Sequence, residues 1–241
     1  MRIRPILFSL SLLALVACSK PTVGQEKSST TVPSTQVAEE SKSSTAEASQ
    51  ETKDSATQET FNGSYYSVQG KYGEIIIVNK KHPLASDYNP GEMPEAVAAF
   101  RELVAHMHSL GYDVSTTNYS GFRSYDTQAG LYQSYVANDG KENADRYSAR
   151  AGYSEHQTGL AYDILDSSGA LLTEPSATKW LAEHAHEYGF IVRYLPDKED
   201  STGYMAESWH IRYIGQEASD IYQSGQTLEE YFGVPGGDYE D

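Results

Sequence analysis

The hydrophobic positions predict a strand and a helix in the central part of the chain. Four β-branched residues fill most of residues 74–79, between Gly73 and the polar Asn79, which is typical of a short buried strand. Residues 94–110 repeat apolar side chains at three- and four-residue steps, namely Val97, Phe100, Val104 and Met107. This period predicts a helix with one buried face, and Gly111 is placed to end it.

Later segments continue the pattern with further short elements. We expect strands at residues 112–119, 160–164, 190–194 and 207–214, and helices at 125–136, 176–189 and 217–232. Residues 138–150 are compatible with a short helix or a lid over a cleft, and 196–204 with a charged loop beside it. The acidic end, residues 236–241, is expected to be frayed. Together these elements predict an α+β fold, a single domain with a central, mainly antiparallel sheet flanked by helices.

Alternation within residues 207–214 assigns side chains to two faces of the sheet. If the odd-numbered residues from Trp209 to Tyr213 face the core, His210 and Arg212 share the opposite face. We therefore expect the functional site on the face of the sheet that carries the polar side chains.

The N-terminal sequence predicts export. Two arginines precede an apolar run, residues 5–17, which is interrupted only by Ser9 and Ser11 and is too short to cross a bilayer. The run leads into Leu-Val-Ala-Cys, which resembles the lipobox of bacterial lipoproteins. We expect residues 1–18 to be a signal peptide and Cys18, the only cysteine, to carry acyl chains that hold the protein at the outer face of the cytoplasmic membrane. A signal peptide with an incidental cysteine is the alternative.

Composition divides the remainder of the chain into two parts. Residues 19–60 are mainly Ser, Thr, Glu, Lys, Ala and Gln, with almost no large apolar side chain. Such a segment cannot bury enough apolar surface to offset the entropy lost on ordering, which predicts a disordered tether. All nineteen tyrosines follow residue 64, so we place the folded domain at residues 61–241.

The formal net charge of −16 argues against a nucleic-acid partner. Neutralising phosphates requires clustered Lys and Arg, and the sequence contains no such cluster. The acidic balance is mainly a contribution to solubility. The sequence leaves the oligomeric state open.

Two imidazoles and one carboxylate form a candidate metal site. His156, Asp163 and His210 can hold a zinc ion on three sides and leave a fourth position for water, as a hydrolase requires. His156 and Asp163 are seven residues apart and would point to opposite faces of a regular strand. The chain must therefore turn between them, and the turn formers Thr158 and Gly159 are suitably placed.

Two further charged residues are candidates for catalysis. Glu207 is a carboxylate of the kind that takes a proton from water and returns it to a leaving amine. Bringing it near His210 requires an irregularity in the strand at Ser208. Arg123 lies in a turn between a predicted strand and a predicted helix, where its guanidinium either pairs with a surface carboxylate or binds a substrate carboxylate or an oxyanion.

Four separated segments resemble the VanY-type bacterial cell-wall carboxypeptidases. They are Val-Asn-Lys-Lys-His-Pro-Leu from residue 78, Ser-Gly-Phe-Arg-Ser from 120, Ser-Glu-His-Gln-Thr-Gly-Leu-Ala-Tyr-Asp from 154 and Glu-Ser-Trp-His from 207. The last two match the S-x-H-x-x-G-x-A-x-D and E-x-W-H signatures of a group that also holds lysostaphin-type peptidases and hedgehog domains. The resemblance covers residues 70–236. More narrowly, the lipobox, tether and Tyr-rich domain resemble the streptococcal lipoprotein L,D-carboxypeptidases, which trim the terminal D-Ala from tetrapeptide stems of peptidoglycan.

The resemblance implies a zinc enzyme and assigns roles to individual residues. The residues expected to bind Zn²⁺ are His156, Asp163 and His210. Glu207 would be the general base, and Arg123 would stabilise an oxyanion or anchor the carboxylate of D-Ala. Ser154 and Gln128 would contact the peptide. The partners implied are peptidoglycan stem peptides and, through the lipid anchor, the membrane.

Two alternatives use the same site. A D,D-carboxypeptidase or D,D-dipeptidase would differ only in the configuration of the residue before the scissile bond, which pocket shape decides. A zinc-bearing lipoprotein could instead bind stem peptides without cutting them, but such a protein needs no base at Glu207. We therefore expect zinc-dependent removal of D-Ala, with L,D activity on tetrapeptides.

Overall fold

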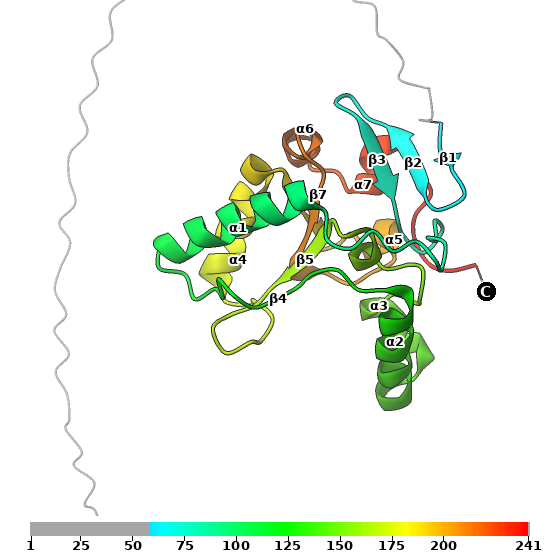
Figure 1. The fold of residues 1–241 in the computed structure, drawn as a ribbon, viewed down its shortest axis with the longest axis horizontal. Coiled ribbons are helices and arrows are strands. Elements are labelled where there is room, and N and C mark those ends of the chain that lie inside the picture. The colour runs from blue at the N-terminus through cyan, green and yellow to red at the C-terminus, as the bar shows by residue number, and fades with distance from the viewer. Residues whose placement is uncertain (1–57, 241) are drawn as a thin grey trace, which may run out of the picture. The chain divides into compact units, whose positions relative to one another are not determined.

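The computed structural model describes residues 58–240, which contain two antiparallel sheets (Figure 1). The smaller sheet has the order β1-β2-β3, with β1 at Thr60–Phe61, β2 at Tyr66–Gln69 and β3 at Glu74–Ile77. The larger sheet has the order β4-β5-β7-β6, with β4 at Tyr119–Ser120, β5 at Ala161–Ile164, β7 at Glu207–Tyr213 and β6 at Phe190–Tyr194. All pairings of these strands are antiparallel, which confirms the predicted fold class. The predicted signal peptide, the lipidation site Cys18 and most of the predicted tether lie outside the described residues.

Helices connect the strands of both sheets. The α-helices are α1 Pro94–Ser109, α2 Tyr125–Asp139, α3 Lys141–Tyr147, α4 Pro175–His184, α5 Glu199–Thr202, α6 Glu217–Ser224 and α7 Leu228–Phe232. Two 3₁₀ helices, η1 Glu155–Thr158 and η2 Ala185–Tyr188, complete them. The predicted helix at residues 94–110 is confirmed as α1, whose first residue, Pro94, has the fixed φ that suits a first turn, and Gly111 follows its end with a φ of 90°.

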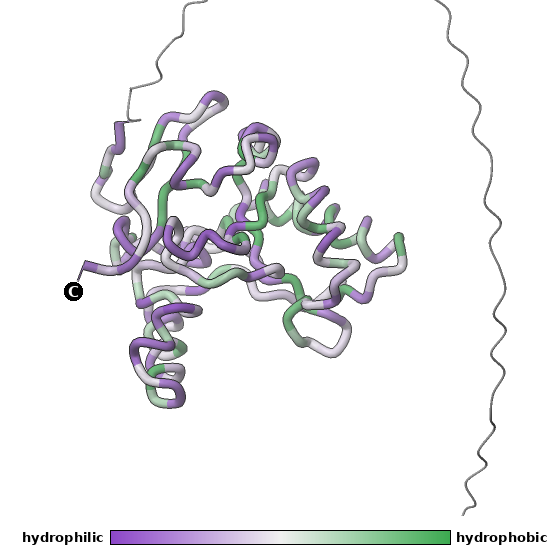
Figure 2. Tube along the Cα trace, turned by 180° about the vertical axis from the view of Figure 1, so that it is seen from behind, coloured by the Kyte–Doolittle hydropathy of each residue, from purple (hydrophilic) through white to green (hydrophobic). Residues whose placement is uncertain are grey.

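One face of the larger sheet packs against α1 and α4 to form the main hydrophobic core. Tyr162 and Ile164 of β5 and Ile211 of β7 are fully buried in it. The ring of Phe100, from α1, stacks on Tyr162 with centroids 4.7 Å apart. Burying side chains of this size contributes roughly 1.5–3 kcal/mol each. In Figure 2 hydrophobic segments colour parts of the central strands, while hydrophobic and polar residues alternate along the helices.

A second, smaller core joins the smaller sheet to the last two helices. Its buried side chains include Val68 and Ile77 of the smaller sheet, Ile221 of α6 and Leu228 of α7. Ile191 extends into this core from β6, on the face of the larger sheet opposite the main core. The two sheets and their helices are thereby connected through apolar packing.

Strand alternation separates the apolar side chains from the polar ones. On β7, Trp209 and Ile211 pack against the main core, whereas His210 and Arg212 alternate with them and belong to a buried polar set. On β5, Asp163 alternates with the core residues in the same way. The predicted assignment of faces is confirmed.

The predicted strand at residues 112–119 is wrong except at its last residue. The hydroxyl of Ser115 accepts hydrogen bonds from the backbone N–H groups of Thr117 and Asn118, at 3.4 and 2.9 Å. These bonds hold the backbone in a turn, so only Tyr119–Ser120 pairs with β5. The sequence also missed the short strands β1 and β2.

The predicted frayed end at residues 236–241 is wrong for the part that the structure describes. The N–H of Gly237 donates a hydrogen bond to the carbonyl of Ser201, and the ring of Tyr239 stacks 3.7 Å from the guanidinium of Arg150. Lys80, which is almost fully buried, binds Asp238 at 2.9 Å. The chain end is therefore packed against residues that are distant in sequence.

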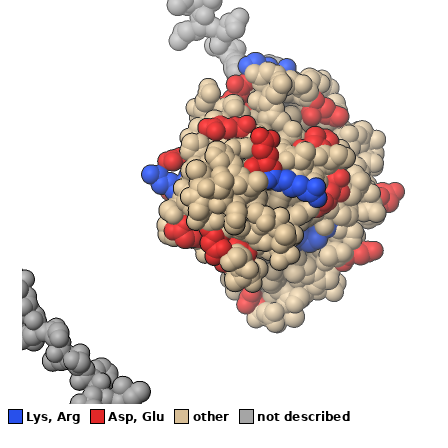
Figure 3. Space-filling model, turned by 60° about the vertical axis from the view of Figure 1, so that its left-hand side comes forward, with Lys and Arg blue, Asp and Glu red and all other residues tan. Residues whose placement is uncertain are grey.

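Among the helices of residues 58–240, none has the length and apolar character that spanning a lipid bilayer requires. On the face that Figure 3 shows, carboxylates are spread over the surface and basic side chains are few. This face offers no basic patch of the kind that binds nucleic acid.

Candidate active site

His156 is placed by a tight turn before β5. It lies in η1, which ends at Gly159 with a φ of 71°. The ring Nδ1 of His156 lies 2.8 Å from the carbonyl oxygen of Gly121. Because a carbonyl only accepts, Nδ1 carries the proton and Nε2 keeps its lone pair. Nε2 is directed at Asp163, whose Oδ2 lies 3.2 Å away.

Asp163 and His210 are brought together by strand pairing. They are directly opposite each other in the antiparallel register of β5 and β7, and both project from the face away from the main core. The Oδ1 of Asp163 lies 2.9 Å from the Nδ1 of His210. The turn at Gly159 and this register together bring the three predicted ligands to one place.

The donor set of these three residues fits a zinc ion. One ligand atom from each of His156, Asp163 and His210 lies within 4.8 Å of the others. All three side chains are largely buried. Two imidazoles and a carboxylate form the three-ligand arrangement that leaves one position open for water.

The electrostatics of the three groups favour a cation. Burial opposes the ionisation of Asp163, but the two histidines outweigh it and hold the pKa of Asp163 well below its usual range. Burial lowers the pKa of His156. Burial also disfavours charge on His210, but its hydrogen bonds to Asp163 and Glu155 raise its pKa to about 9. Zinc binding would displace the proton from His210, because only the neutral ring is a ligand.

Glu207 lies beside this cluster at the start of β7. Val192 pairs with Ile211 and Tyr194 with Glu207, so β7 contains extra residues relative to β6 between these two pairs. This bulge is the irregularity that the sequence required at Ser208. It places the Oε2 of Glu207 4.0 Å from the Nδ1 of His210. Burial raises the pKa of Glu207 to about 7, against the opposing effect of His210.

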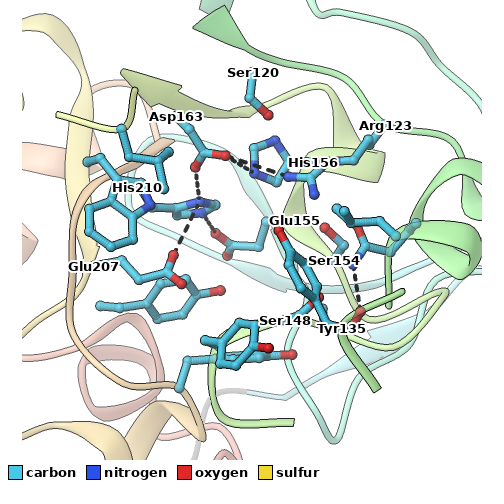
Figure 4. Close-up of a pocket in the computed structure, with 18 of the residues that line it drawn as sticks. Ser120, Arg123, Tyr135, Ser148, Ser154, Glu155, His156, Asp163, Glu207 and His210 are labelled. Atoms are coloured by element: carbon cyan, nitrogen blue, oxygen red, sulfur yellow. Dashed lines mark hydrogen bonds and ion pairs between the residues drawn. The ribbon is translucent and has the colours of Figure 1, made fainter. Parts of the chain in front are cut away.

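Arg123 lies on the other side of Asp163. Its backbone N–H donates to the carbonyl of His156 at 3.2 Å, and its Nη2 lies 3.6 Å from the Oδ2 of Asp163 (Figure 4). Its Nε is buried and has no partner among the described residues. Burial lowers the pKa of the Arg123 guanidinium, although Asp163 opposes this shift. A donor held in this state is suited to an incoming carboxylate or oxyanion.

The candidate residues line one cavity of about 530 Å³. Ser154 and Gln128, for which the resemblance implies contact with the peptide, are in its lining, and both are buried. Gln128 donates from Nε2 to the carbonyl of Ala149 at 2.6 Å, while its Oε1 has no partner among the described residues. Further lining side chains are Tyr135, Tyr147, Leu171, Tyr194, Tyr204 and Met205. The cavity therefore has space for a peptide beside the metal site.

A family model described as VanY, D-alanyl-D-alanine carboxypeptidase, matches residues 92–216, just over half of the chain. The matched segment contains the three candidate ligands together with Glu207 and Arg123. The chain belongs to the VanY family.

Solved structures of VanY relatives agree with this assignment. The L,D-carboxypeptidase DacB of Streptococcus pneumoniae is 58% identical, and the match covers 76% of this chain and 100% of DacB with a TM-score of 0.74. The LD-carboxypeptidase LdcB, whose structure concerns peptidoglycan recognition, is 57% identical over 77% of this chain and 100% of LdcB, with a TM-score of 0.75. The D,D-pentapeptidase VanY of the VanB-type resistance cassette, in complex with Zn(II), is 32% identical over 65% of this chain and 97% of its own, with a TM-score of 0.57.

The sequence missed one residue that contacts the candidate ligands of this VanY-family site. Glu155 is completely buried, and its Oε2 lies 3.3 Å from the Nε2 of His210. Its Oε1 accepts hydrogen bonds from Arg193 at 2.9 Å and Arg212 at 3.0 Å. A glutamate directly before the histidine of the motif was the available signal. Arg193 and Arg212, which neutralise its charge, are distant from Glu155 in sequence. The ion pairs could therefore not be predicted from the sequence.

Proposed function

We propose that this protein is a zinc-dependent L,D-carboxypeptidase that removes the terminal D-Ala from tetrapeptide stems of peptidoglycan. The observation that carries the proposal is the approach of Glu207 to the cluster of His156, Asp163 and His210. The choice of reaction is supported by the 58% identity to the L,D-carboxypeptidase DacB over its full length.

The three ligands and Glu207 would share the work of hydrolysis. His156, Asp163 and His210 would hold a zinc ion, which when bound supplies a Lewis acid for the attacking water and the scissile carbonyl. Glu207 accepts the proton of that water and delivers it to the departing amine of D-Ala. A carboxyl group with a pKa of about 7 is suited to both steps near neutral pH.

Arg123 and Gln128 would bind the end of the substrate. The guanidinium of Arg123 would pair with the terminal carboxylate of D-Ala, which restricts cleavage to the last peptide bond. The same group could instead stabilise the oxyanion. The Oε1 of Gln128, which is buried and has no partner among the described residues, would accept a hydrogen bond from a peptide N–H, and Ser154 would add a hydroxyl on the same wall.

A D,D-carboxypeptidase is the second candidate. It is favoured by the similarity to the D,D-pentapeptidase VanY, although at 32% identity this relative is more distant. A protein that binds stem peptides without cutting them is disfavoured because Glu207 is held at the metal site.

Muropeptides with defined stems separate these candidates. Residues 58–241 would be incubated with tri-, tetra- and pentapeptide muropeptides, with zinc or with a chelator, and the products resolved by chromatography and mass. We expect loss of one D-Ala from the tetrapeptide alone, and no cleavage with chelator. Cleavage of only the pentapeptide would establish the D,D alternative. Three intact peptides in the presence of bound zinc would exclude the hydrolase.

We further propose that residues 61–241 form the catalytic domain and that Cys18 anchors it outside the cytoplasmic membrane. The apolar run before Cys18 and the peptidoglycan recognition of the relative LdcB support this location. Substituting Cys18→Ala in the full chain should move the protein from the membrane fraction to the medium. Retention of the variant in the membrane would contradict the lipid anchor.

A further inference from the structure

The two ring nitrogens of His210 face different carboxylates. Nδ1 lies 2.9 Å from Asp163 and 4.0 Å from Glu207, on the side of the candidate metal site. Nε2 lies 3.3 Å from the Oε2 of Glu155, which is not one of the three candidate ligands (Figure 4). A carboxylate oxygen only accepts, so the contact with Glu155 places a proton on Nε2. In the neutral ring this leaves the lone pair of Nδ1 directed at the metal site.

Glu155 is held in place by two buried arginines. Arg193 and Arg212 both donate to its Oε1, at 2.9 and 3.0 Å, and all three side chains are almost completely buried. Its Oε2 therefore remains for His210. The arginines come from neighbouring strands, β6 and β7, and are fixed by the same sheet that carries His210. The carboxylate is thus balanced in charge and restricted in orientation.

We propose that Glu155 is a positioning residue for the metal site. By accepting a hydrogen bond from Nε2–H, it fixes the tautomer and the ring orientation in which His210 presents Nδ1 to the metal. His156 is oriented in the opposite sense, because its Nδ1 donates to the carbonyl of Gly121. The two histidines therefore bind through different nitrogens, each set by the partner of the other nitrogen. The inference rests on the zinc site of the proposed function.

The same charge cluster offers a matched control. Glu229 is also buried and accepts hydrogen bonds from Nη1 and Nη2 of Arg193, at 2.9 and 2.5 Å. Asn79 donates to it at 3.0 Å. Among the described residues, the side chain of Glu229 thus contacts Arg193 and Asn79 but not His210. Removing the charge of Glu229 should disturb its ion pair with Arg193, while Glu155 keeps its contacts with Arg212 and His210.

The experiment compares Glu155→Gln with Glu229→Gln in the complete domain. Zinc affinity is measured by competition with a chromogenic chelator, and the ligand field by the visible spectrum of the Co²⁺-loaded protein. We expect Glu155→Gln to weaken zinc binding by roughly 10–100-fold and to change the Co²⁺ spectrum. Glu229→Gln should keep a zinc affinity close to that of the wild type, because Glu229 contacts none of the three proposed ligands. Wild-type affinity in Glu155→Gln, or equal losses in both variants, would overturn the proposal.

A measurement on the unaltered protein covers the case in which Glu155→Gln does not fold. Long-range ¹H–¹⁵N correlation spectra of the zinc-loaded wild type report which nitrogen of His210 is protonated. We expect Nε2–H for His210 and Nδ1–H for His156. A proton on Nδ1 of His210 would refute the role of Glu155. Zinc affinity and the protonation state of His210 are both measured without peptide cleavage. A protein that binds zinc but cuts no muropeptide would therefore refute the proposed function and leave the role of Glu155 standing.

Discussion

Glu207 shows at the scale of one residue how a reactive group affects stability. Its carboxyl group is largely buried, and burial raises its pKa from 4.5 to about 7. In the unfolded chain the group ionises near 4.5, so ionisation favours unfolding once the pH exceeds that value. The destabilisation is absent below pH 4.5, grows between pH 4.5 and 7 and is complete above pH 7.

Substituting Glu207→Gln should therefore stabilise the metal-free protein at pH 8. A shift of this size corresponds to on the order of 3 kcal/mol in the free energy of unfolding. The gain should vanish near pH 4, where the carboxyl group is neutral in both states. Urea unfolding at the two pH values measures it, with the exposed Glu102→Gln as control. An equal effect at both pH values would contradict the buried charge.

The same substitution should abolish most of the activity. Loss of a general base typically costs 10²–10⁴-fold in rate, so kcat of the zinc-loaded Glu207→Gln enzyme is expected to fall by roughly this factor. Zinc affinity should remain close to that of the wild type, because Glu207 is not one of the three proposed ligands. A variant that keeps its activity would show that another group moves the proton.

For individual residues, the sequence was sufficient to predict the ligands and Glu207, but not the contact of Glu155 with His210. His156, Asp163, His210 and Glu207 were identified by residue type and motif, and the structure brings them together. Glu155 was missed because its role depends on arginines that follow it by 38 and 57 positions. Burial of a charge is a property of tertiary packing, and local sequence does not report it.

Among the secondary-structure elements and turns, the turn at Gly159 is the one that positions His156 relative to Asp163. Its φ of 71° is one that residues with a Cβ rarely adopt, and a Cβ would lie 2.0 Å from the carbonyl oxygen of Gly91. The turn is thus fixed both by backbone conformation and by close packing against the loop before α1. It reverses the chain between η1 and β5, which allows His156 and Asp163 to face each other.

We expect Gly159→Ala to lower stability and zinc affinity together. The clash requires the loop at Gly91 to move, so the loss should be on the order of 3 kcal/mol or more. Gly225→Ala is the control, because Gly225 has a similar φ of 66° and open space around it. That variant should lose about 1 kcal/mol and keep the zinc affinity of the wild type. Similar losses in the two variants would contradict the role of close packing.

Periodicity identified the long elements and failed at the short polar ones. The helix at residues 94–110 was predicted because its apolar face repeats over four turns. The strand expected at 112–119 was wrong because the side chain of Ser115 bonds to the backbone and forms a turn. The two-residue strand β1 is too short for any period to be visible in the sequence.

Across the whole molecule, the chain end supports a wall of the cleft. The hydroxyl of Tyr239 accepts a hydrogen bond from the N–H of Arg150 at 3.0 Å and lies 3.3 Å from the hydroxyl of Tyr204, which lines the cavity. Burial raises the pKa of Tyr239 to about 12, so the group remains a neutral hydroxyl near neutral pH. This packing could not be predicted from the sequence, because Gly and acidic residues are typical of frayed ends.

Substituting Tyr239→Phe should weaken substrate binding without affecting the metal. Loss of the hydroxyl removes about 1 kcal/mol of hydrogen bonding from the wall, so KM for the tetrapeptide should rise by roughly fivefold. Zinc affinity and kcat should change little. Tyr72→Phe, at a half-exposed ring beside Lys71, is the control. If Tyr239→Phe changes only the melting temperature, the chain end serves stability alone.

The contact between Tyr239 and the cleft wall also makes position 240 a natural place for an optical reporter. The side chain of Glu240 is 84% exposed and follows directly after Tyr239. Since Cys18 is the only native cysteine and precedes the domain, a cysteine introduced at position 240 could be labelled selectively with an environment-sensitive dye. If occupancy of the cleft shifts the chain end, the dye would report the binding of cell-wall fragments or inhibitors without any chemical turnover.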